Sequence, residues 1–383
     1  MDLLGGLTAS EFLRDYWQKK PLVIRQALPA FTCPVSPDEL AGLACEATVE
    51  SRIVIENDGG KPWQLHNGPF SPERFSELPE QDWTLLVQGL DHWVPEIADL
   101  LDHFRFIPNW RLDDIMASYA PKGGSVGPHY DMYDVFLLQA HGHRRWTFGG
   151  MCDPSSPQVD GTPLRILRDW QGEQTVTLAP GDMLYLPPGM GHHGIAEDDC
   201  ITLSVGFRAP TVDDVLTSFT DYLSQRAESA HHLGDPDLQV QNNPGAIGPE
   251  VVERLDALIR AQLGDRRDLA LWFGQFATAP KSLDIVVPPD EPAEAGDLAR
   301  AITEGQQLRW NEGSRFAYHE LEHETALFVD GEQYLLKGEA RPVAPLLCAS
   351  ASIEMPALAQ FGEDPAILGL LTVLYNQGSI YFG

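Results

Sequence analysis

The chain has 383 residues, of which 43% are hydrophobic, enough for a sizeable core and for two or three domains. It carries 56 acidic against 26 basic residues, a formal net charge of −30. Such an excess of negative charge argues against a nucleic-acid or anionic-membrane partner and is compatible with a basic protein partner. The same acidity would also serve solubility in a salty cytoplasm, and composition does not separate these two explanations.

The five cysteines are scattered along the chain and include no Cys-x-x-Cys pair. This pattern is typical of reduced thiols in a cytosol and predicts neither a zinc framework nor a disulfide framework. No apolar run approaches the roughly 20 residues that a membrane-spanning helix needs. The N-terminus also lacks the basic-then-apolar design of a secretion signal. We therefore expect a cytoplasmic protein without a membrane partner.

Capping motifs predict two helix starts near the N-terminus. Thr8-Ala9-Ser10-Glu11 forms a capping box, and Ser36-Pro37-Asp38-Glu39 repeats the device with proline at the first helical position. The stretch that follows, to about Pro108, predicts a mixed region rich in loops.

Between Asp113 and Arg208 short apolar runs alternate with Gly, Pro and Asp. Many short strands at close spacing favour a barrel or sandwich over alternating βα units. The candidate strands are Ile115–Tyr119, Val135–Gln139, Arg145–Phe148, Thr175–Leu178, Met183–Leu186 and Ile201–Phe207.

Beyond Thr211 the pattern is helical. One predicted helix begins within Thr211-Val212-Asp213-Asp214, and another begins at Pro249 and ends before Gly264, with a loop between them at residues 231–248. Apolar stripes of this kind belong more often to a chain's own core than to a dimer face. The stripes consist of Val215, Leu216, Phe219, Tyr222 and Leu223 in the first helix and of Val252, Leu255, Leu258 and Ile259 in the second.

Residues 281–383 predict a small α+β or winged-helix unit. The Asp330-Gly331 pair indicates a tight hairpin turn, and helical patterns follow Pro345 and Pro365. Winged helices often bind DNA, but this segment has 16 acidic against 6 basic side chains. A phosphate-facing surface is therefore not expected here.

Two distant segments carry metal-ligand types at matched spacing. In the first, Gly123 is followed after five residues by His129-x-Asp131; in the second, Gly181 is followed after five residues by Pro187-x-Gly189-x-x-His192. These are the patterns of the two halves of a cupin barrel. Glycines and prolines turn the chain between short strands, so that the side chains beyond the turns point into one barrel mouth.

Two imidazoles and one carboxylate form the facial triad of non-haem iron(II) oxygenases, which leaves one face of the ion open. A four-ligand cupin site would have histidine in place of Asp131 and glutamate at one of the positions held by Val135 and Phe136. Copper or structural zinc would prefer cysteine or a closed set of four ligands. The sequence thus predicts an open iron(II) site that activates dioxygen.

Neighbouring residues compete for some of these roles. His193 is the rival of His192 as the third ligand, but the Gly-x-x-His spacing favours His192, and adjacent strand residues point to opposite faces. Arg144, fifteen residues after His129, is the candidate cation for a co-substrate carboxylate, and Arg145 should face the other way. Ser118 could add a hydroxyl contact to the same carboxylate.

A second metal motif is His319-Glu320-Leu321-Glu322-His323, which matches the zincin pattern His-Glu-x-x-His. The segment is short, runs into the predicted hairpin and has no clear third ligand downstream. We predict surface histidines rather than a metalloprotease. The His231-His232 pair is likewise predicted to lie in an exposed loop or at a helix end.

At these residues the chain resembles the JmjC-domain 2-oxoglutarate oxygenases and, among them, the bacterial ribosomal oxygenases. The resemblance is specific over about residues 1–210 and rests on the order of parts beyond them. It is carried by Phe12-Leu13-x-x-Tyr16-Trp17-x-Lys19-x-Pro21-Leu22, Gly127-Pro128-His129-x-Asp131-x-Tyr133-Asp134-Val135-Phe136, Arg144-Arg145-Trp146, Pro180-Gly181-Asp182, the Pro187–His192 segment and Ser204-Val205-Gly206-Phe207-Arg208-Ala209-Pro210.

The resemblance implies a mainly β fold with additional helices. Residues 1–210 would form a double-stranded β-helix, the jelly-roll or cupin barrel of JmjC domains. Residues 211–280 would form a helical dimerisation region and residues 281–383 a winged-helix-like α+β domain. The expected assembly is a homodimer.

It also implies an activity and its cofactors. His129, Asp131 and His192 would hold iron(II), and Arg144 would bind the distal carboxylate of 2-oxoglutarate. With dioxygen, the enzyme would hydroxylate an arginine side chain of the large-subunit ribosomal protein L-sixteen and release succinate and carbon dioxide. A very basic substrate is compatible with the charge of −30. Asp134 is a candidate carboxylate for pairing with the positive charge of that substrate.

Two alternatives share these residues. An N-methyl demethylase hydroxylates a methyl group on nitrogen and releases formaldehyde, whereas a side-chain hydroxylase leaves the oxygen on its product. A non-catalytic cupin scaffold would bind a charged partner and form no succinate with any substrate.

Overall fold

The computed structural model describes residues 3–58, 61–226, 232–240, 242–263, 265–281, 285–353, 358–361 and 364–382. Contacts divide the chain into one compact unit that extends to Ala209 and a second that takes most of the chain from Pro210 onward. Among the described residues, no helix combines the length and apolar composition needed to cross a bilayer.

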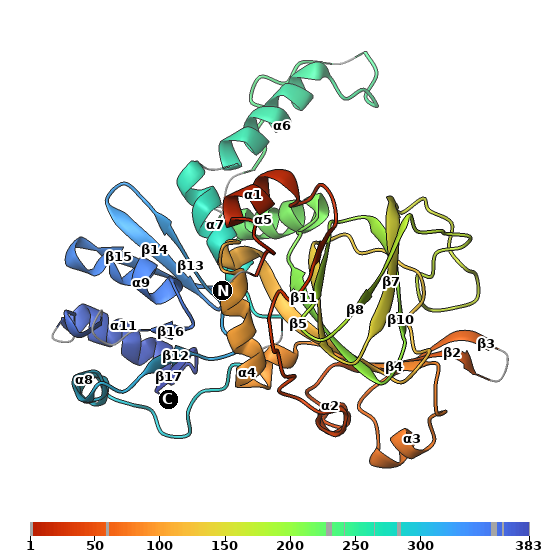
Figure 1. Ribbon diagram of the computed structural model, residues 1–383. Helices are drawn as coiled ribbons and strands as arrows, with labels where there is room; N and C mark the ends of the chain where they lie inside the picture. Colours follow the sequence, from red (N-terminus) through yellow and green to blue (C-terminus); the bar gives the residue numbers. More distant parts are fainter. Residues whose placement is uncertain are drawn as a thin grey trace. The chain divides into compact units, whose positions relative to one another are not determined.

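The first unit contains two antiparallel sheets (Figure 1). The large sheet has the strand order β1-β9-β6-β11-β5-β4-β2-β3, and the small one has the order β10-β7-β8. The strands are β1 (Leu22–Ile24), β2 (Ser51–Asp58), β3 (Lys61–Asn67), β4 (Trp83–Val87), β5 (Leu112–Ala120), β6 (Val135–His141), β7 (Arg144–Met151), β8 (Gln174–Leu178), β9 (Met183–Leu186), β10 (Met190–Ala196) and β11 (Cys200–Phe207). This is the predicted jelly-roll barrel.

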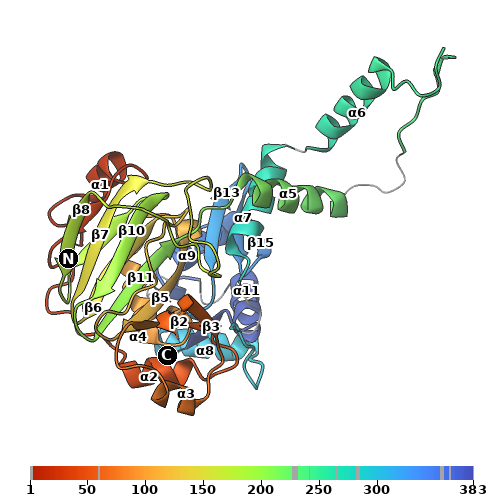
Figure 2. The ribbon, with the colours of Figure 1, turned by 90° about the vertical axis from the view of Figure 1, so that its right-hand side faces the viewer.

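Strand β6 shows why the two sheets face each other (Figure 2). Successive strand residues point to opposite faces, and β6 is apolar on both. Val135 and Leu137 enter a core between the sheets with Trp146 and Leu178 of the small sheet. The alternating residues of β6, such as Phe136, enter the main core on the other face of the large sheet. Burial on both faces explains the continuous apolar run of this strand.

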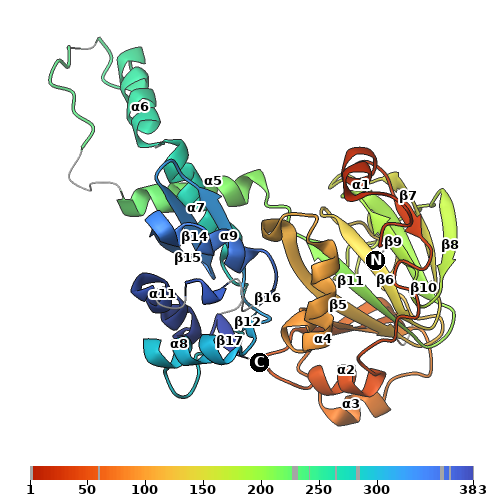
Figure 3. The ribbon, with the colours of Figure 1, turned by 60° about the vertical axis from the view of Figure 1, so that its left-hand side comes forward.

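The N-terminal segment covers the outer face of the large sheet (Figure 3). The helices of this unit are α1 (Ala9–Asp15), α2 (Pro37–Leu43), α3 (Pro72–Ser76) and α4 (Pro95–Ala98), with 3-10 turns at Leu90–His92, Asp99–Phe104 and Asn109–Arg111. Both predicted capping boxes are confirmed, at Thr8 with Glu11 and at Ser36 with Glu39. Phe12 of α1 is fully buried and packs its ring 4.9 Å from that of Tyr185.

Two parts of the strand prediction are wrong. In the stretch before Pro108, predicted as mixed and rich in loops, no strand was predicted, yet β2, β3 and β4 extend the large sheet there. Strand β10 was missed because its sequence, Met190–Ala196, contains two glycines and two histidines and has no β-rich pattern of its own. It forms a strand because it pairs along its length with β7.

The second unit contains helices and two small antiparallel sheets, β16-β12-β17 and β13-β14-β15. Helices α8 and α11 lie side by side (Figures 1 and 3). The helices are α5 (Val212–Arg226), α6 (Pro249–Gln262), α7 (Arg266–Thr278), α8 (Ala295–Glu304), α9 (Val343–Cys348) and α11 (Pro365–Asn376), with a 3-10 turn at Gly338–Ala340. The strands are β12 (Leu308–Trp310), β13 (Phe316–Glu320), β14 (Glu324–Val329), β15 (Glu332–Lys337), β16 (Ser352–Ile353) and β17 (Ile380–Phe382).

The predicted hairpin joins β14 to β15. Its turn residues Asp330 and Gly331 have φ angles of 51° and 87°, which is the left-handed region that this turn requires. The helix after Pro365 is confirmed, whereas the helix near Pro345 begins two residues earlier, at Val343. Helix α7 was not predicted, and the prediction that placed Gly264 at a helix end lies outside the described residues.

The apolar stripe of α6 is not part of the core in the described residues, contrary to the expectation. Val252 and Ile259 are each 57% exposed, Leu255 is 39% exposed and Leu258 is 40% exposed. In α5 the expectation holds only in part. Phe219 is buried against Trp272 of α7, with ring centroids 4.9 Å apart, whereas Leu216 is 57% exposed.

The Asp330 carboxylate gives the second unit a pH-dependent stability. It accepts hydrogen bonds from Ser314 Oγ (2.9 Å), Ser379 Oγ (2.6 Å) and the Arg315 amide (2.8 Å), while burial raises its pKa to about 6. A carboxyl whose pKa is higher in the folded than in the unfolded state stabilises the fold at low pH. That contribution is lost as the pH rises through about 6.

We predict that the free energy of unfolding of Asp330→Asn rises relative to wild type between pH 4 and pH 8, by about 1–2 kcal/mol. The amide cannot ionise, and asparagine tolerates the left-handed turn. Urea unfolding across this pH range measures the difference. The control is Glu322→Gln, at a side chain that is 88% exposed. A difference that stays constant with pH would contradict the assignment.

Candidate metal centre

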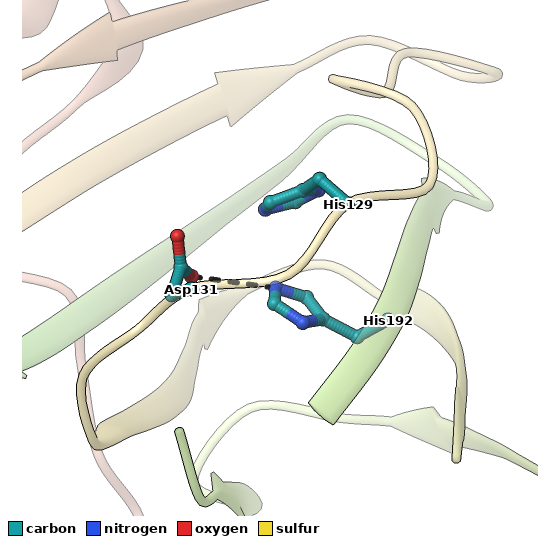
Figure 4. Close-up of side chains that lie close together, drawn as sticks. All are labelled: His129, Asp131 and His192. Atoms are coloured by element: carbon teal, nitrogen blue, oxygen red, sulfur yellow. Dashed lines mark ion pairs between the residues drawn. The ribbon is translucent and has the colours of Figure 1, made fainter. Parts of the chain in front are cut away.

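The side chains of His129, Asp131 and His192 lie close together (Figure 4). One ligand atom from each lies within 4.8 Å of the others, and this is the one such group of three or more metal-ligating side chains within the described ranges. Asp131 Oδ2 lies 3.6 Å from His192 Nε2, and the two imidazole centroids are 4.2 Å apart. The structure thus unites the two halves of the motif.

Backbone pairing brings these segments together. His129 and His192 form an isolated antiparallel bridge, in which each amide donates to the other residue's carbonyl, at 2.9 Å and 2.8 Å. The Gly189 amide donates to the Asp131 carbonyl at 2.7 Å. Gly127 and Gly189 have φ angles of 80° and 79°, so the tight turns beside the ligands need glycine.

The ring orientations suit metal binding. Nδ1 of His129 lies 2.8 Å from the Gly127 carbonyl, and Nδ1 of His192 lies 3.0 Å from the Met190 carbonyl. Because a carbonyl only accepts, each Nδ1 carries the proton and Nε2 keeps its lone pair for a metal. Burial, together with the nearby His129 ring, lowers the pKa of His192 to about 4. His192 is therefore neutral at neutral pH, which is the form that binds metals.

This donor set fits a divalent metal such as iron(II). Two imidazole nitrogens and one carboxylate oxygen on adjacent positions leave the rest of the coordination sphere open. His192 rather than His193 belongs to the group. In the β7–β10 register His192 lies opposite Phe148 and His193 lies opposite Thr147, on the other face of the strand.

Arg144 is buried in the barrel interior and is only 3% exposed. Its Nη1 donates to Ser118 Oγ at 3.3 Å, while its Nε and Nη2 have no hydrogen-bond partner among the described residues. A buried guanidinium with two unpaired donor nitrogens is stabilised by binding an anion. Arg145 is half-exposed and lies 3.9 Å from Glu197, so the two arginines do face opposite ways, as predicted.

Asp134 does not face a substrate, contrary to the expectation. Its side chain is completely buried and accepts hydrogen bonds from Tyr185 Oη (2.6 Å) and Gln18 Nε2 (2.9 Å). Burial raises its pKa, while these donors act in the opposite direction. The carboxylate ties the N-terminal segment to the large sheet and so has a structural role.

The remaining histidine motifs do not form metal sites among the described residues. His319 lies in strand β13 and His323 follows its end, so the pair is not on a helix as the zincin motif requires. Both are exposed. His232 is also exposed, and His231 lies outside the described residues.

The rim of the metal group is apolar, a feature that the sequence reasoning missed. Met132 is 56% exposed, Tyr133 42% and Met151 67%. Met132 and Tyr133 directly follow Asp131, while Met151 Cε would lie 3.2 Å from a Cβ on Gly189. Large exposed apolar side chains beside a site indicate an interaction surface. The sequence feature that could have predicted this apolar rim is the position of Met132 and Tyr133 directly after Asp131.

The comparisons with known proteins agree with this fold. A family model described as the JmjC domain matches residues 99–215, and a model described as the ROXA-like winged helix matches residues 260–381. The chain is 35% identical to the ribosomal protein uL16 3-hydroxylase of Escherichia coli, over 97% of both chains. It is 36% identical to a probable ribosomal oxygenase of Haemophilus influenzae, over 85% of this chain and 82% of that one.

Solved structures extend the likeness to the whole chain. A crystal structure of E. coli YcfD superposes with a TM-score of 0.88 at 33% identity and covers 99% of both chains. A structure of the same protein, a ribosomal oxygenase, in complex with cobalt and 2-oxoglutarate has a TM-score of 0.86 at 34% identity and covers 98% of both chains.

The barrel, its triad of metal-ligating side chains and the C-terminal winged helix define a JmjC-domain protein of the cupin fold. The chain belongs to the ribosomal oxygenase family that includes the E. coli uL16 3-hydroxylase.

The structural role of Asp134 leads to a stability prediction. Tyr185→Phe removes the phenol that donates to this buried carboxylate, and we expect the free energy of unfolding to fall by about 1–3 kcal/mol. Chemical unfolding measures the loss, while metal affinity should not change. Tyr318→Phe, at a side chain that is 42% exposed, is the matched control and should have little effect. Unchanged stability of Tyr185→Phe would show that Asp134 does not depend on this hydrogen bond.

Proposed function

We propose that this chain is an iron(II)- and 2-oxoglutarate-dependent protein hydroxylase whose substrate is an arginine side chain of a large-subunit ribosomal protein. The observation that carries the proposal is the coexistence, in one barrel, of the open His129, Asp131 and His192 group with the buried donors of Arg144. The kinship with a uL16 hydroxylase and with a protein that binds cobalt and 2-oxoglutarate supports it.

In this proposal Nε2 of His129, Nε2 of His192 and the Asp131 carboxylate hold the iron. The backbone carbonyls behind both histidines fix the ring orientation and keep the proton on Nδ1. When bound, the iron supplies dioxygen activation, in which 2-oxoglutarate is converted to succinate and carbon dioxide while the substrate gains one oxygen atom.

Arg144 and Ser118 hold the distal carboxylate of 2-oxoglutarate. In the register, Ser118 of β5 and Gln139 of β6 both pair with Thr202 of β11, so all three side chains enter the interior at one level. The Thr202 hydroxyl donates to Gln139 at 3.0 Å. The Arg144 guanidinium has two donor nitrogens, Nε and Nη2, without a partner among the described residues, and it can bind a carboxylate through both at once.

The substrate side of the site is acidic. Partial burial, then the carboxylate of Asp131 and, more weakly, those of Asp114 and Asp113 raise the pKa of Tyr133 at the rim. Asp114 is only 4% exposed. Carboxylates clustered behind an apolar rim suit a side chain that combines an aliphatic stem with a cationic head. This arrangement supports arginine, and the net charge of −30 supports a basic protein around it.

The proposal extends to the assembly and the rest of the chain. We propose that residues 211–280 form the contact of a homodimer, because the α6 stripe is exposed in the single chain. Residues 281–383 would form a winged-helix domain that does not bind nucleic acid, since it has 16 acidic against 6 basic side chains. With a ribosomal protein as its substrate, the enzyme would act in the cytoplasm.

Mass analysis of ribosomal proteins tests the proposal. We expect the purified protein, with iron(II), ascorbate and 2-oxoglutarate, to add one oxygen atom to an arginine of one large-subunit protein and to form succinate. His129→Ala and Asp131→Ala should abolish both, because each removes a metal ligand. The control is His319→Ala, at an exposed histidine of the second unit, which should remain fully active.

Three results would contradict the proposal. Succinate formation that persists in both ligand variants would exclude this metal site. Formaldehyde release in place of oxygen retention would assign the protein as a demethylase, and the absence of succinate with all substrates would assign it as a binding scaffold.

A second prediction concerns the co-substrate. Arg144→Ala should raise the 2-oxoglutarate concentration needed for half-maximal turnover by about 10- to 100-fold, because it removes charge-assisted hydrogen bonds. Steady-state succinate formation measures it. The neighbouring half-exposed Arg145 provides the control, and Arg145→Ala should leave the requirement unchanged. Equal effects of the two substitutions would show that Arg144 does not bind the co-substrate.

A further inference from the structure

Strand β7 carries a second buried donor beside Arg144. Trp146 is 4% exposed, and its indole N–H, like the Nε and Nη2 of Arg144, has no hydrogen-bond partner among the described residues. Residues two apart on a strand point to the same face. Buried N–H groups in folded proteins are nearly always paired, so three open donors on one face of one strand indicate an acceptor that binds there.

The strand register locates the indole between the two ends of the proposed site. Opposite β10, Phe148 pairs with His192, Trp146 pairs with Gly194, and Arg144 pairs with Ala196. Trp146 is therefore at the level between the metal ligand and the guanidinium. Its ring centroid lies 5.9 Å from that of His192, and the Arg144 Cζ lies 5.8 Å from the indole.

The packing of the indole defines which edge is open. A Cβ on Gly194 would lie only 2.7 Å from Cη2 and Cζ3 of Trp146, so β10 needs glycine at this point to admit the ring. These carbons belong to the six-membered ring, on the edge opposite Nε1. The N–H edge is therefore turned away from β10.

Among the described residues the Trp146 indole N–H has no acceptor. Its buried cluster is apolar and includes Val135, Leu137 and Leu184. Aliphatic side chains cannot accept a hydrogen bond, but they suit the two methylene groups of a dicarboxylate. The ligand class that matches an apolar wall with a guanidinium fork and one further N–H is a short dicarboxylate.

We propose that the Trp146 indole N–H donates a hydrogen bond to the distal carboxylate of 2-oxoglutarate, alongside Arg144. This inference rests on the proposed function and adds a ligand-binding residue to it. Trp146 thereby contributes to co-substrate affinity and selects for a ligand with a second carboxylate.

Trp146→Phe tests the proposal, because phenylalanine retains an aromatic ring and lacks the N–H. With the full chain loaded with zinc, calorimetry should show about 10-fold weaker binding of 2-oxoglutarate and of succinate. Oxalate can chelate the metal but has no distal carboxylate, so its affinity should not change. The control is Trp83→Phe in the same unit, whose indole already donates to the Pro79 carbonyl at 2.7 Å.

A second measurement uses the unsubstituted protein and does not depend on the folding of a variant. In nitrogen-15 spectra of the zinc-loaded chain, the Trp146 indole proton signal should move downfield when 2-oxoglutarate is added, as expected for a new hydrogen bond to a carboxylate. Oxalate should not cause this shift.

Three outcomes would overturn the inference, each in a recognisable way. Unchanged 2-oxoglutarate and succinate affinities in Trp146→Phe, with an unmoved indole signal, would overturn this inference and leave the proposed function intact. An equal loss of oxalate affinity would show that the indole acts at the metal end instead. Failure of the zinc-loaded wild-type chain to bind 2-oxoglutarate at all would overturn the proposed function and, with it, this inference.

Discussion

The reciprocal pair of backbone hydrogen bonds between His129 and His192 is the interaction on which the metal site depends. It joins the turn that leads into β6, a strand of the large sheet, to strand β10 of the small sheet. A slip of one residue in the β10 register would turn His192 away and bring His193 inward. The hydrogen bond from the Gly189 amide to the Asp131 carbonyl fixes the backbone of Asp131 relative to the two histidines. Ligand geometry here is a consequence of strand pairing.

The barrel interior is arranged for charges that the protein itself does not supply. His192 is kept neutral by burial, and Arg144 is buried with two donors that no described residue satisfies. Each arrangement costs free energy unless a partner binds, because a buried polar group loses its water. A cation at the histidines and an anion at the guanidinium would relieve these costs together. The same reasoning accounts for the open indole N–H of Trp146, between the two.

Carboxylates in this chain perform two different tasks. Asp134 and Asp330 are hydrogen-bonded by neighbouring side chains and hold segments of their own units together. Asp131 and Asp114, by contrast, are near the rim residue Tyr133. Sequence position does not separate these tasks, since Asp131 and Asp134 are only three residues apart. The difference arises from the turn before β6, which presents Asp131 at the barrel mouth and carries Asp134 under the N-terminal segment.

The sequence by itself determined the ligand types, a barrel or sandwich of short strands, the capping boxes of α1 and α2 and the Asp330-Gly331 hairpin, because local chemistry encodes each of them. Tertiary structure alone decided that Met190–Ala196 is a strand, that Asp134 is structural and that the α6 stripe is exposed. It also left the Arg144 and Trp146 donors without a partner among the described residues, at adjacent levels of one strand. These properties depend on which distant segments pair and what covers them, and no local pattern carries that information.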